Sequence, residues 1–184
     1  MDILPISFYQ GRETATIARD LLGMVLVRES PAGMASGIIV ETEAYLAMHD
    51  PASHSFRGPT KRNQAMYGPP GSSYVYISYG IHHCMNVVCQ SEGVAEAVLI
   101  RSLLPLSGAD LMRSRRRDVP ERQLANGPGK VCQVMAIDLS LNGHPLQQAP
   151  LYILAGERPR YVEATPRIGI SKGTELPLRF LARM

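Results

Sequence analysis

Two carboxylates that share one predicted strand are the residues best suited to chemistry in this sequence. Glu41 and Glu43 lie in the segment VETEAY (residues 40–45), directly before a long irregular stretch. Because alternate residues of a strand share a face, both are expected to point the same way as Tyr45. A carboxylate beside an aromatic ring can act as a general base toward water, since burial raises its pKa toward the working pH. From this pair alone, however, a solvated strand face is the simpler interpretation.

A tyrosine-rich segment, SYVYISYG (residues 73–80), follows the irregular stretch. By the same alternation, Tyr74 and Tyr76 share one face of a predicted strand with Ser78. We expect Tyr74 to be half-buried with its hydroxyl bonded, as is usual for a packed tyrosine. Tyr79 directly precedes Gly80 and should lie at a strand end or turn, where an aromatic ring can protrude as a wedge between stacked bases.

The irregular stretch carries a basic loop, RGPTKRN (residues 57–63), in which glycine and proline lie beside cations. Such a loop can hold phosphates through side chains and backbone N–H groups. It is not a Walker loop, because it lacks the GxxxxGK[ST] pattern. The residues predicted to contact a phosphate backbone are Arg57, Lys61, Arg62 and Asn63.

Four histidines in the same region do not form a recognisable metal site. The region has neither an HExxH motif nor paired cysteines, which zinc sites commonly use. We therefore predict no metal at His49, His54, His82 and His83.

Hydrophobic periodicity indicates the elements that must position these residues. Within residues 12–22, one face of a predicted helix is apolar and consists of Ile17, Ala18, Leu21 and Leu22. Gly23 lies where that helix would stop. Residues 107–124 are helical at first, and a short buried helix with Pro128 near its start is expected within residues 126–137. Strands are predicted at residues 24–29, 37–45, 73–79, 84–90, 97–104, 151–156, 160–164 and 177–181. The first two are neighbours that could form a hairpin, and the next three indicate an antiparallel meander.

The composition is that of a globular chain with a modest positive charge. The chain has 184 residues, of which 45% are hydrophobic, and its net charge is +3, which permits an anionic partner. Of the basic residues, 16 are Arg and 3 are Lys; this bias suits phosphate ligands but also follows from a GC-rich genome. No apolar run is long enough to span a bilayer, and no signal peptide is apparent. Three cysteines without CxxC pairing favour a reducing cytoplasm.

Five arginines gather in the segment 107–124, at positions 113, 115, 116, 117 and 122. We interpret them as a solvated helical face, with acidic neighbours as local partners, and DNA contact is the alternative. The acidic neighbours are Asp110, Asp118 and Glu121.

The chain resembles the alkyladenine (3-methyladenine) DNA glycosylase family. The resemblance lies in an ordered series of blocks that covers most of the chain, and their combination is specific. The blocks are VETEAY at 40–45, His54, RN at 62–63, YVYISYG at 74–80, CMN at 84–86, LIRSL at 99–103, NGPGK at 126–130, RIGI at 167–170 and PLRF at 177–180. The resemblance implies a single α+β domain over residues 1–184, with an antiparallel, barrel-like sheet and a few surrounding helices.

The resemblance also implies a reaction, the hydrolysis of the N-glycosidic bond of damaged purines without metal or cofactor. By position, Glu43 is similar to the base that deprotonates the attacking water. Arg101 and the backbone carbonyl near Ile168 are similar to the groups that hold this water. The implied partner is double-stranded DNA that contains damaged purines, and a monomer suits an enzyme that scans DNA.

The remaining assignments carried by the resemblance concern the extruded base. Tyr45, His54 and Tyr76 are similar to the walls around it, and Tyr79 is similar to the wedge that fills the gap in the duplex. Asn86 is similar to the group that clashes with the 2-amino group of normal guanine.

Two other functions are compatible with the residues. One is a non-catalytic nucleic-acid-binding module on the same fold, with Glu43 as a surface carboxylate. The other is a metal-dependent hydrolase that uses the histidines.

Overall fold

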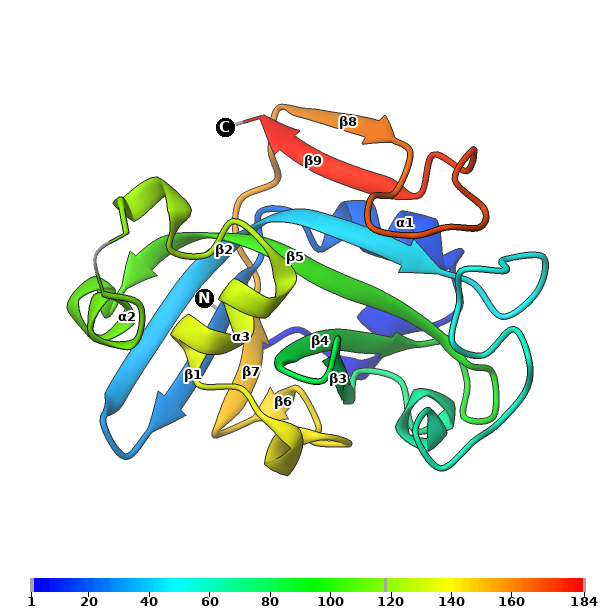
Figure 1. Ribbon diagram of the computed structural model, residues 1–184, viewed down its shortest axis with the longest axis horizontal. Helices are drawn as coiled ribbons and strands as arrows, with labels where there is room; N and C mark the ends of the chain where they lie inside the picture. Colours follow the sequence, from blue (N-terminus) through cyan, green and yellow to red (C-terminus); the bar gives the residue numbers. More distant parts are fainter. Residues whose placement is uncertain (1, 118, 184) are drawn as a thin grey trace.

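One long strand, β2 (Gly33–Tyr45), organises the computed structural model, which describes residues 2–117 and 119–183 (Figure 1). Its first half pairs with β1 (Val25–Ser30), and its last residues pair with β9 (Arg179–Arg183). On its other edge, β2 pairs with β5 (Glu96–Ser107) over most of its length. The end of β2 that carries Glu41 and Glu43 is therefore fixed by hydrogen-bonded strands on both sides.

The sheet is antiparallel and curls into a half-barrel (Figure 1). Among the described residues, its strands follow the order β3-β4-β5-β2-β1-β7-β6, and β8 is joined through β9. This confirms the predicted α+β class with an antiparallel, barrel-like sheet. The remaining strands are β3 (Ser73–Ser78), β4 (His82–Cys89), β6 (Gln147–Gln148), β7 (Leu151–Leu154) and β8 (Tyr161–Thr165).

Each predicted strand is present, with shifted bounds. The first two form the expected hairpin, which closes between Ser30 and Gly33. The strand β2 begins four residues earlier than predicted, because its first residues pair with β1 although they include too few apolar side chains to show a strand pattern. The strands β3, β4 and β5 pair in sequence as the predicted meander.

The helices are short and pack against the sheet: α1 on β2 and β5, and α3 on β4 and β5. The first helix stops before Gly23, as predicted; this glycine has φ +85°, and an added Cβ would lie 2.0 Å from the carbonyl oxygen of Glu157. Pro128 is at the start of α3, where a backbone N–H would have no partner within the helix, so proline breaks no hydrogen bond there. The helices are α1 (Thr14–Asp20), α2 (Ala109–Arg115) and α3 (Pro128–Met135), with 3₁₀ turns η1 (Ile6–Tyr9), η2 (Gln64–Tyr67), η3 (Glu121–Gln123) and η4 (Leu139–Leu141).

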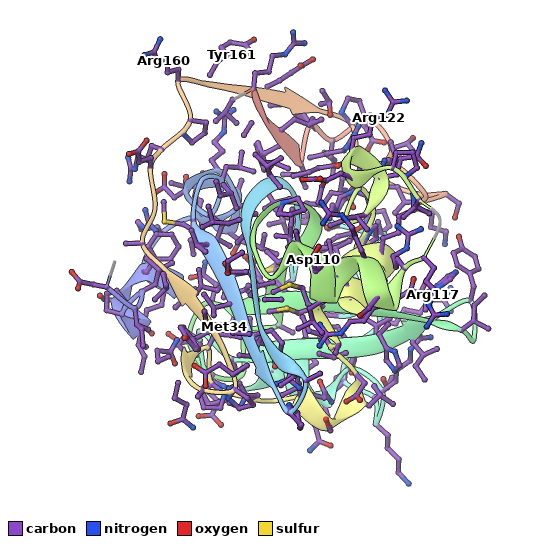
Figure 2. The ribbon with its side chains drawn as sticks, turned by 90° about the vertical axis from the view of Figure 1, so that its left-hand side faces the viewer. Met34, Asp110, Arg117, Arg122, Arg160 and Tyr161 are labelled. Atoms are coloured by element: carbon purple, nitrogen blue, oxygen red, sulfur yellow. The ribbon has the colours of Figure 1, made fainter. Side chains whose placement is uncertain are left out.

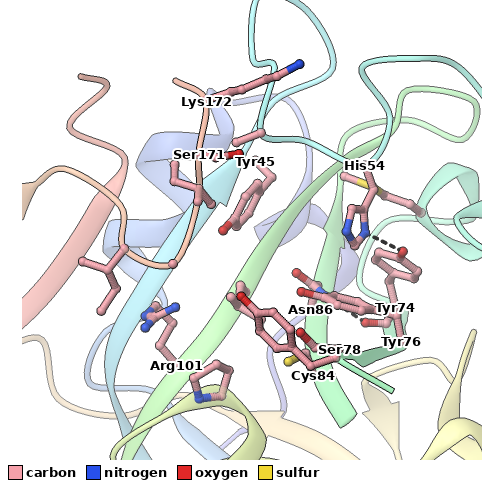
Figure 3. A pocket seen from close by; sticks show the side chains of 18 of the residues that line it. Tyr45, His54, Tyr74, Tyr76, Ser78, Cys84, Asn86, Arg101, Ser171 and Lys172 are labelled. Atoms are coloured by element: carbon pink, nitrogen blue, oxygen red, sulfur yellow. Dashed lines mark hydrogen bonds between the residues drawn. The ribbon is translucent and has the colours of Figure 1, made fainter. Parts of the chain in front are cut away.

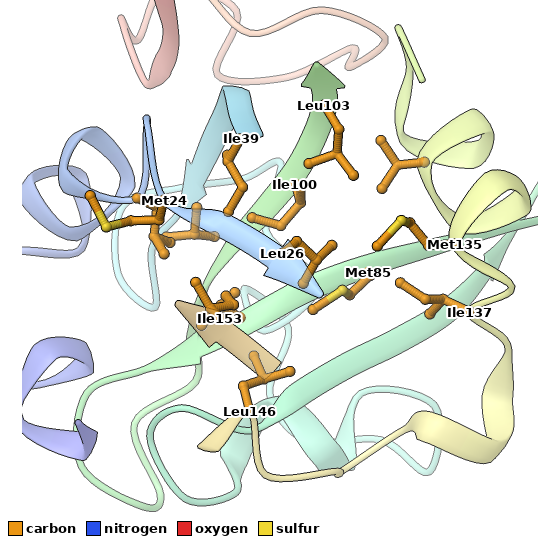
Figure 4. Close-up of a cluster of buried hydrophobic side chains, with 14 of the residues drawn as sticks. Met24, Leu26, Ile39, Met85, Ile100, Leu103, Met135, Ile137, Leu146 and Ile153 are labelled. Carbon is orange, nitrogen blue, oxygen red and sulfur yellow. The ribbon is translucent and has the colours of Figure 1, made fainter. Parts of the chain in front are cut away.

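The hydrophobic core is formed by side chains from the strands and the helices (Figure 4). Leu26, Ile39 and Ile100 contribute from three adjacent strands, and Met135 contributes from α3; all four are fully buried. Burying each such side chain is worth about 1.5–3 kcal/mol. The core therefore holds β2 and β5, which carry the candidate catalytic residues, in a fixed relation.

The arginine cluster of residues 113–122 is largely part of the scaffold. Arg115 donates to the carbonyl of Val134 near the end of α3, and Arg116 donates to the carbonyls of Gln123 and Leu124. Arg113 forms ion pairs with Asp110 and Glu121, two of its predicted partners, while Asp118 lies outside the described residues. Arg117 and Arg122 are exposed (Figure 2). The cluster is thus not one uniformly solvated face.

Two further expectations concern the whole chain. In the described part, no helix combines the length and the apolar composition that crossing a membrane requires. The three cysteines are buried and free.

Candidate active site

A cavity of about 510 Å³ opens beside the end of β2 (Figure 3). Its walls come from the strands β2 to β5, from the connection after β2, and from the connection between β8 and β9. Predicted residues that line it are Tyr45, His54, Arg62, Tyr76, Tyr79, Asn86, Arg101 and Ile168. The fold thus brings together blocks that are far apart in the sequence.

Glu43 lies behind this cavity and is fully buried. Its Oε1 accepts a hydrogen bond from the backbone N–H of Ile168 (3.1 Å), and its Oε2 accepts from the hydroxyl of Tyr45 (2.8 Å) and from Arg101 (3.2 Å). All three donors line the cavity. The interpretation of this strand face as solvated is therefore wrong, because the neighbouring strands and the connection before β9 cover it.

Arg101 joins the two carboxylates of the strand. It donates to Glu43 and to Oε1 of Glu41 (3.0 Å), which also accepts from Arg179 (2.6 Å). Glu41 and Glu43 therefore share a face of β2, as predicted. Burial lowers the pKa of Arg101, but the carboxylates of Glu43 and Glu41 outweigh burial, and the net effect raises that pKa above its ordinary value. Arg101 therefore remains a cation beside the two carboxylates.

Tyr45 forms one wall of the cavity and stays protonated. Burial and the adjacent Glu43 carboxylate raise the pKa of its hydroxyl well above the ordinary range. Its hydroxyl donates a hydrogen bond to Glu43, so this cavity-lining ring is tethered through its polar end.

An aromatic cluster forms a second wall (Figure 3). The rings of His54 and Tyr76 meet edge-on with centroids 4.6 Å apart, and Tyr74 and Tyr76 lie side by side with centroids 5.4 Å apart. The hydroxyl of Tyr74 bonds to Nδ1 of His54 at 2.9 Å, which confirms the expected bonded hydroxyl, but the residue is buried and not half-buried as predicted. Burial raises the pKa of Tyr74 to about 12. These contacts fix the positions of the three rings in this wall.

His54 is held neutral by its surroundings. Partial burial against the tyrosines lowers its pKa, and the nearby cation of Arg62 lowers it further. The guanidinium of Arg62 lies 5.5 Å from the centre of the Tyr76 ring and donates to the carbonyl of Ile77.

Replacing Arg62 by Met is expected to raise the pKa of His54, because the substitution removes a cation that opposes protonation of the imidazole. The measurement is an NMR titration of the imidazole signals in both proteins. Lys61→Met is the matched control, since it removes an exposed cation one residue away and should leave the His54 titration in place. An unchanged midpoint in Arg62→Met would show that burial alone sets the protonation state of His54.

Tyr79 and Asn86 lie at opposite depths of the cavity. Tyr79 is 86% exposed and lies in the turn between β3 and β4 (residues 79–81), with φ +49°, followed by Gly80 at φ +75°. Such a turn matches the twist of the two strands and makes the Tyr79 ring the tip of a hairpin. Asn86 is buried in β4 and donates its amide to the carbonyl of Tyr74 (3.0 Å). Asn86 thus bonds nearby backbone and also lines the cavity.

The basic loop is only partly available to a phosphate backbone. Arg57 and Lys61 are exposed. Asn63 is buried, and its side chain donates to the carbonyls of His54 and Gly58 and accepts from the N–H of Thr60. The prediction that Asn63 contacts DNA is therefore corrected: its amide is used to shape the loop that carries His54. Arg62 is exposed as well and also lines the cavity, so its contact with a phosphate backbone stays a prediction.

The connection before β9 supplies residues that the sequence patterns did not single out. Ser171 and Lys172 line the cavity mouth (Figure 3). Their segment has no periodicity, and only the folded chain brings it back to the end of β2. The backbone near Ile168 is present as expected, but the contact that the structure shows is an N–H donated to Glu43.

The histidines near the hairpin lie beside a separate cavity of about 360 Å³, lined by His82, His83 and Cys132 among others. No group of three or more potential metal-binding side chains occurs among the residues that the structure describes.

Comparison with known proteins agrees with the geometry. The family model of methylpurine-DNA glycosylase matches residues 7–184. A protein of Rubrobacter xylanophilus named "Putative 3-methyladenine DNA glycosylase" is 53% identical over 164 residues, which is 88% of this chain and 85% of that protein. Proteins of the same name from Carboxydothermus hydrogenoformans and Methanoculleus marisnigri are 50% and 48% identical; these matches cover 97% and 96% of this chain, and 94% and 93% of the relatives.

The matched residues include the buried carboxylate, its arginine and the aromatic walls of the cavity, and the match extends over nearly the whole chain. The chain therefore belongs to the methylpurine-DNA glycosylase family, whose members are hydrolases that cleave the N-glycosidic bond of bases in DNA.

Proposed function

We propose that this enzyme is a monofunctional glycosylase that draws an alkylated or deaminated purine out of duplex DNA into the cavity and hydrolyses its N-glycosidic bond. The observation that carries the proposal is the buried Glu43, held by three donors directly behind an aromatic-walled cavity. A base cannot be attacked within the stack, so it must leave the duplex, at a cost of a few kcal/mol. Damaged and mismatched bases leave more cheaply, which supplies a first level of selection.

The walls suit such a base. A purine alkylated at N3 or N7 is cationic, and Tyr45 and Tyr76 offer aromatic faces that attract a cation. The same charge makes the base a good leaving group. The protein is then required chiefly to provide a nucleophile and to stabilise the developing charge on the sugar.

Glu43 is the proposed general base. Its Oε2 accepts two hydrogen bonds, whereas Oε1 accepts only the N–H of Ile168 among the described residues, which leaves a lone pair for a water molecule. In the proposed step, the water oxygen bonds to C1′ of the sugar, the C1′–N bond to the purine breaks, and Glu43 takes the proton. The negative charge of Glu43 also stabilises the cationic sugar in the transition state. Arg101 positions the carboxylate and lines the cavity.

The test is a single-turnover assay with methylated duplex DNA. Free purine should be released, the abasic strand should remain intact until it is treated with alkali, and EDTA should leave the rate unchanged. Damaged-duplex binding without release of purine would instead support the non-catalytic binding module. Loss of release in EDTA would point to a metal-dependent hydrolase.

Tyr79 is the proposed wedge, and Tyr79→Ser should weaken excision through loss of the flipped state. Stacking of an aromatic side chain on a base is worth about 1–3 kcal/mol, so the loss should be roughly 5- to 150-fold. Flipping can be measured with a fluorescent base analogue beside the lesion. Tyr161→Ser is the matched control, because Tyr161 is also exposed but lies on β8. Equal fluorescence changes for wild type and Tyr79→Ser would remove the wedge role.

A further inference from the structure

An ion pair lies behind the candidate active site, and both of its members are completely buried. Arg167 donates from Nη1 to Oδ2 of Asp50 (2.7 Å) and from Nη2 to Oδ1 (2.6 Å), so the guanidinium and the carboxylate meet through two parallel hydrogen bonds. Neither side chain lines the cavity. We call this pair the clamp.

The clamp joins segments that are distant in the sequence. Arg167 also donates to the carbonyl of Ala44, at the end of β2. Asp50 accepts the backbone N–H groups of Leu46 and Ala52 in the connection that follows β2. Through these contacts, the connection before β9 is fastened to the end of the strand that carries Glu43.

Two of the three donors to Glu43 depend on this fastening. The guanidinium of Arg167 lies over the ring of Tyr45, 4.7 Å from its centre, and the hydroxyl of that ring donates to Glu43. The residue after Arg167 is Ile168, whose N–H donates to the other oxygen of Glu43. The third donor, Arg101, comes from β5 and is held separately by Glu41.

We propose that Asp50 and Arg167 are positioning residues for the reaction: the clamp fixes the Tyr45 hydroxyl and the Ile168 N–H, and these donors fix the orientation of the Glu43 carboxylate. This inference rests on the proposed role of Glu43 as the base. Neither residue touches the substrate. The clamp acts on the angle at which the carboxylate faces the attacking water and the sugar.

Stability alone does not account for the pair. Replacing a buried ion pair by well-packed apolar side chains of similar volume is often neutral or stabilising, because removing two charges from water is costly. The clamp also leaves the buried Nε of Arg167 without a hydrogen bond partner among the described residues. An apolar replacement of both residues can therefore separate positioning from stability.

The experiment compares wild type with the double variant Arg167→Met, Asp50→Leu in single-turnover base release. The backbone N–H groups of Leu46 and Ala52 lose their acceptor, so we expect a lower melting temperature. At a temperature where the variant is folded, the dissociation constant for damaged duplex should remain near that of wild type, while the release rate falls by about 10- to 100-fold, as for small misplacements of reacting groups. A wild-type release rate in a folded double variant that binds normally would overturn the proposal, because a purely structural role would lower the melting temperature alone.

If the double variant does not fold, Arg167→Lys provides the test. Lysine keeps a cation beside Asp50 but cannot form two parallel hydrogen bonds, so release should slow at unchanged duplex binding. A folded Arg167→Lys with the wild-type rate would overturn the proposal equally.

Two controls separate the possible failures. Arg12→Met, Asp20→Leu removes another ion pair, which is located at α1, and should leave the release rate unchanged. Glu43→Gln in the same assay tests the role of the base by itself. If Glu43→Gln retains activity, the proposed mechanism fails whatever the clamp variants do. If Glu43→Gln is inactive and the clamp variants are fully active, only the clamp proposal fails.

Discussion

Base release by the Glu43→Gln variant is expected to fall by about 10²- to 10⁴-fold, the usual contribution of a general base. Glutamine has nearly the same shape as glutamate but cannot take a proton from water. Because the side chain keeps its shape and loses only its basicity, binding of damaged duplex should remain largely intact. The measurement is single-turnover purine release at saturating enzyme, together with the dissociation constant for the same duplex.

Glu43→Gln is also expected to lower the stability of the folded protein. Both oxygens of Glu43 accept hydrogen bonds, so the amide NH₂ of glutamine must face either the Ile168 N–H or the donors Tyr45 and Arg101. An unsatisfied buried donor costs about 1–3 kcal/mol, and the melting temperature should fall accordingly.

Glu41→Gln is the matched control for the role of the base. Glu41 lies on the same face of β2 as Glu43 and also accepts a hydrogen bond from Arg101. The Tyr45 hydroxyl and the Ile168 N–H, however, donate to Glu43. Release should fall much less than in Glu43→Gln. Full activity of Glu43→Gln with an inactive Glu41→Gln would transfer the role of the base to Glu41.

Asn86→Ser is expected to release normal guanine from a G·T mismatch, about 10- to 200-fold faster than wild type, which is the range that one small group in a pocket can discriminate. Guanine differs from hypoxanthine by an exocyclic amino group, and a pocket can reject that group by crowding it. Asn86 is buried, lines the cavity and is fixed by its bond to the carbonyl of Tyr74, so it cannot easily move aside. Serine makes room.

The mismatch matters because a mispaired guanine leaves the stack cheaply. Excision of alkylated adenine should persist, since Glu43 and its donors are unchanged. Asn142→Ser is a suitable control: Asn142 also bonds backbone of β3, accepting the N–H of Val75, but it lies outside the cavity. If Asn86→Ser keeps its activity on alkylated adenine without gaining guanine release, Asn86 is not the selectivity gate.

The sequence predicted the parts of the site that depend on local pattern. The alternation of residues 40–45 placed Glu41 and Glu43 on one face, and their shared contact with Arg101 confirms it. The hairpin with Tyr79 at its tip also followed from a local signal, an aromatic residue before Gly80.

The parts that were missed depend on long-range closure. The connection before β9 has no periodicity, so nothing local indicates that Lys172 borders the cavity, and only the resemblance pointed to Ile168. Asn63 was misjudged for the same reason: an asparagine in a basic loop looks like a phosphate ligand until its amide is seen bonded to the carbonyls of His54 and Gly58.

The left-handed backbone of Tyr79 has a consequence for protein engineering. A residue with a side chain pays about 1–2 kcal/mol for this conformation, and the exposed ring recovers little of it by packing in the free enzyme. Glycine or asparagine would suit the position better in the absence of DNA. Selection for heat resistance alone would therefore favour loss of this tyrosine, and a thermostable variant obtained in that way would lack the proposed wedge.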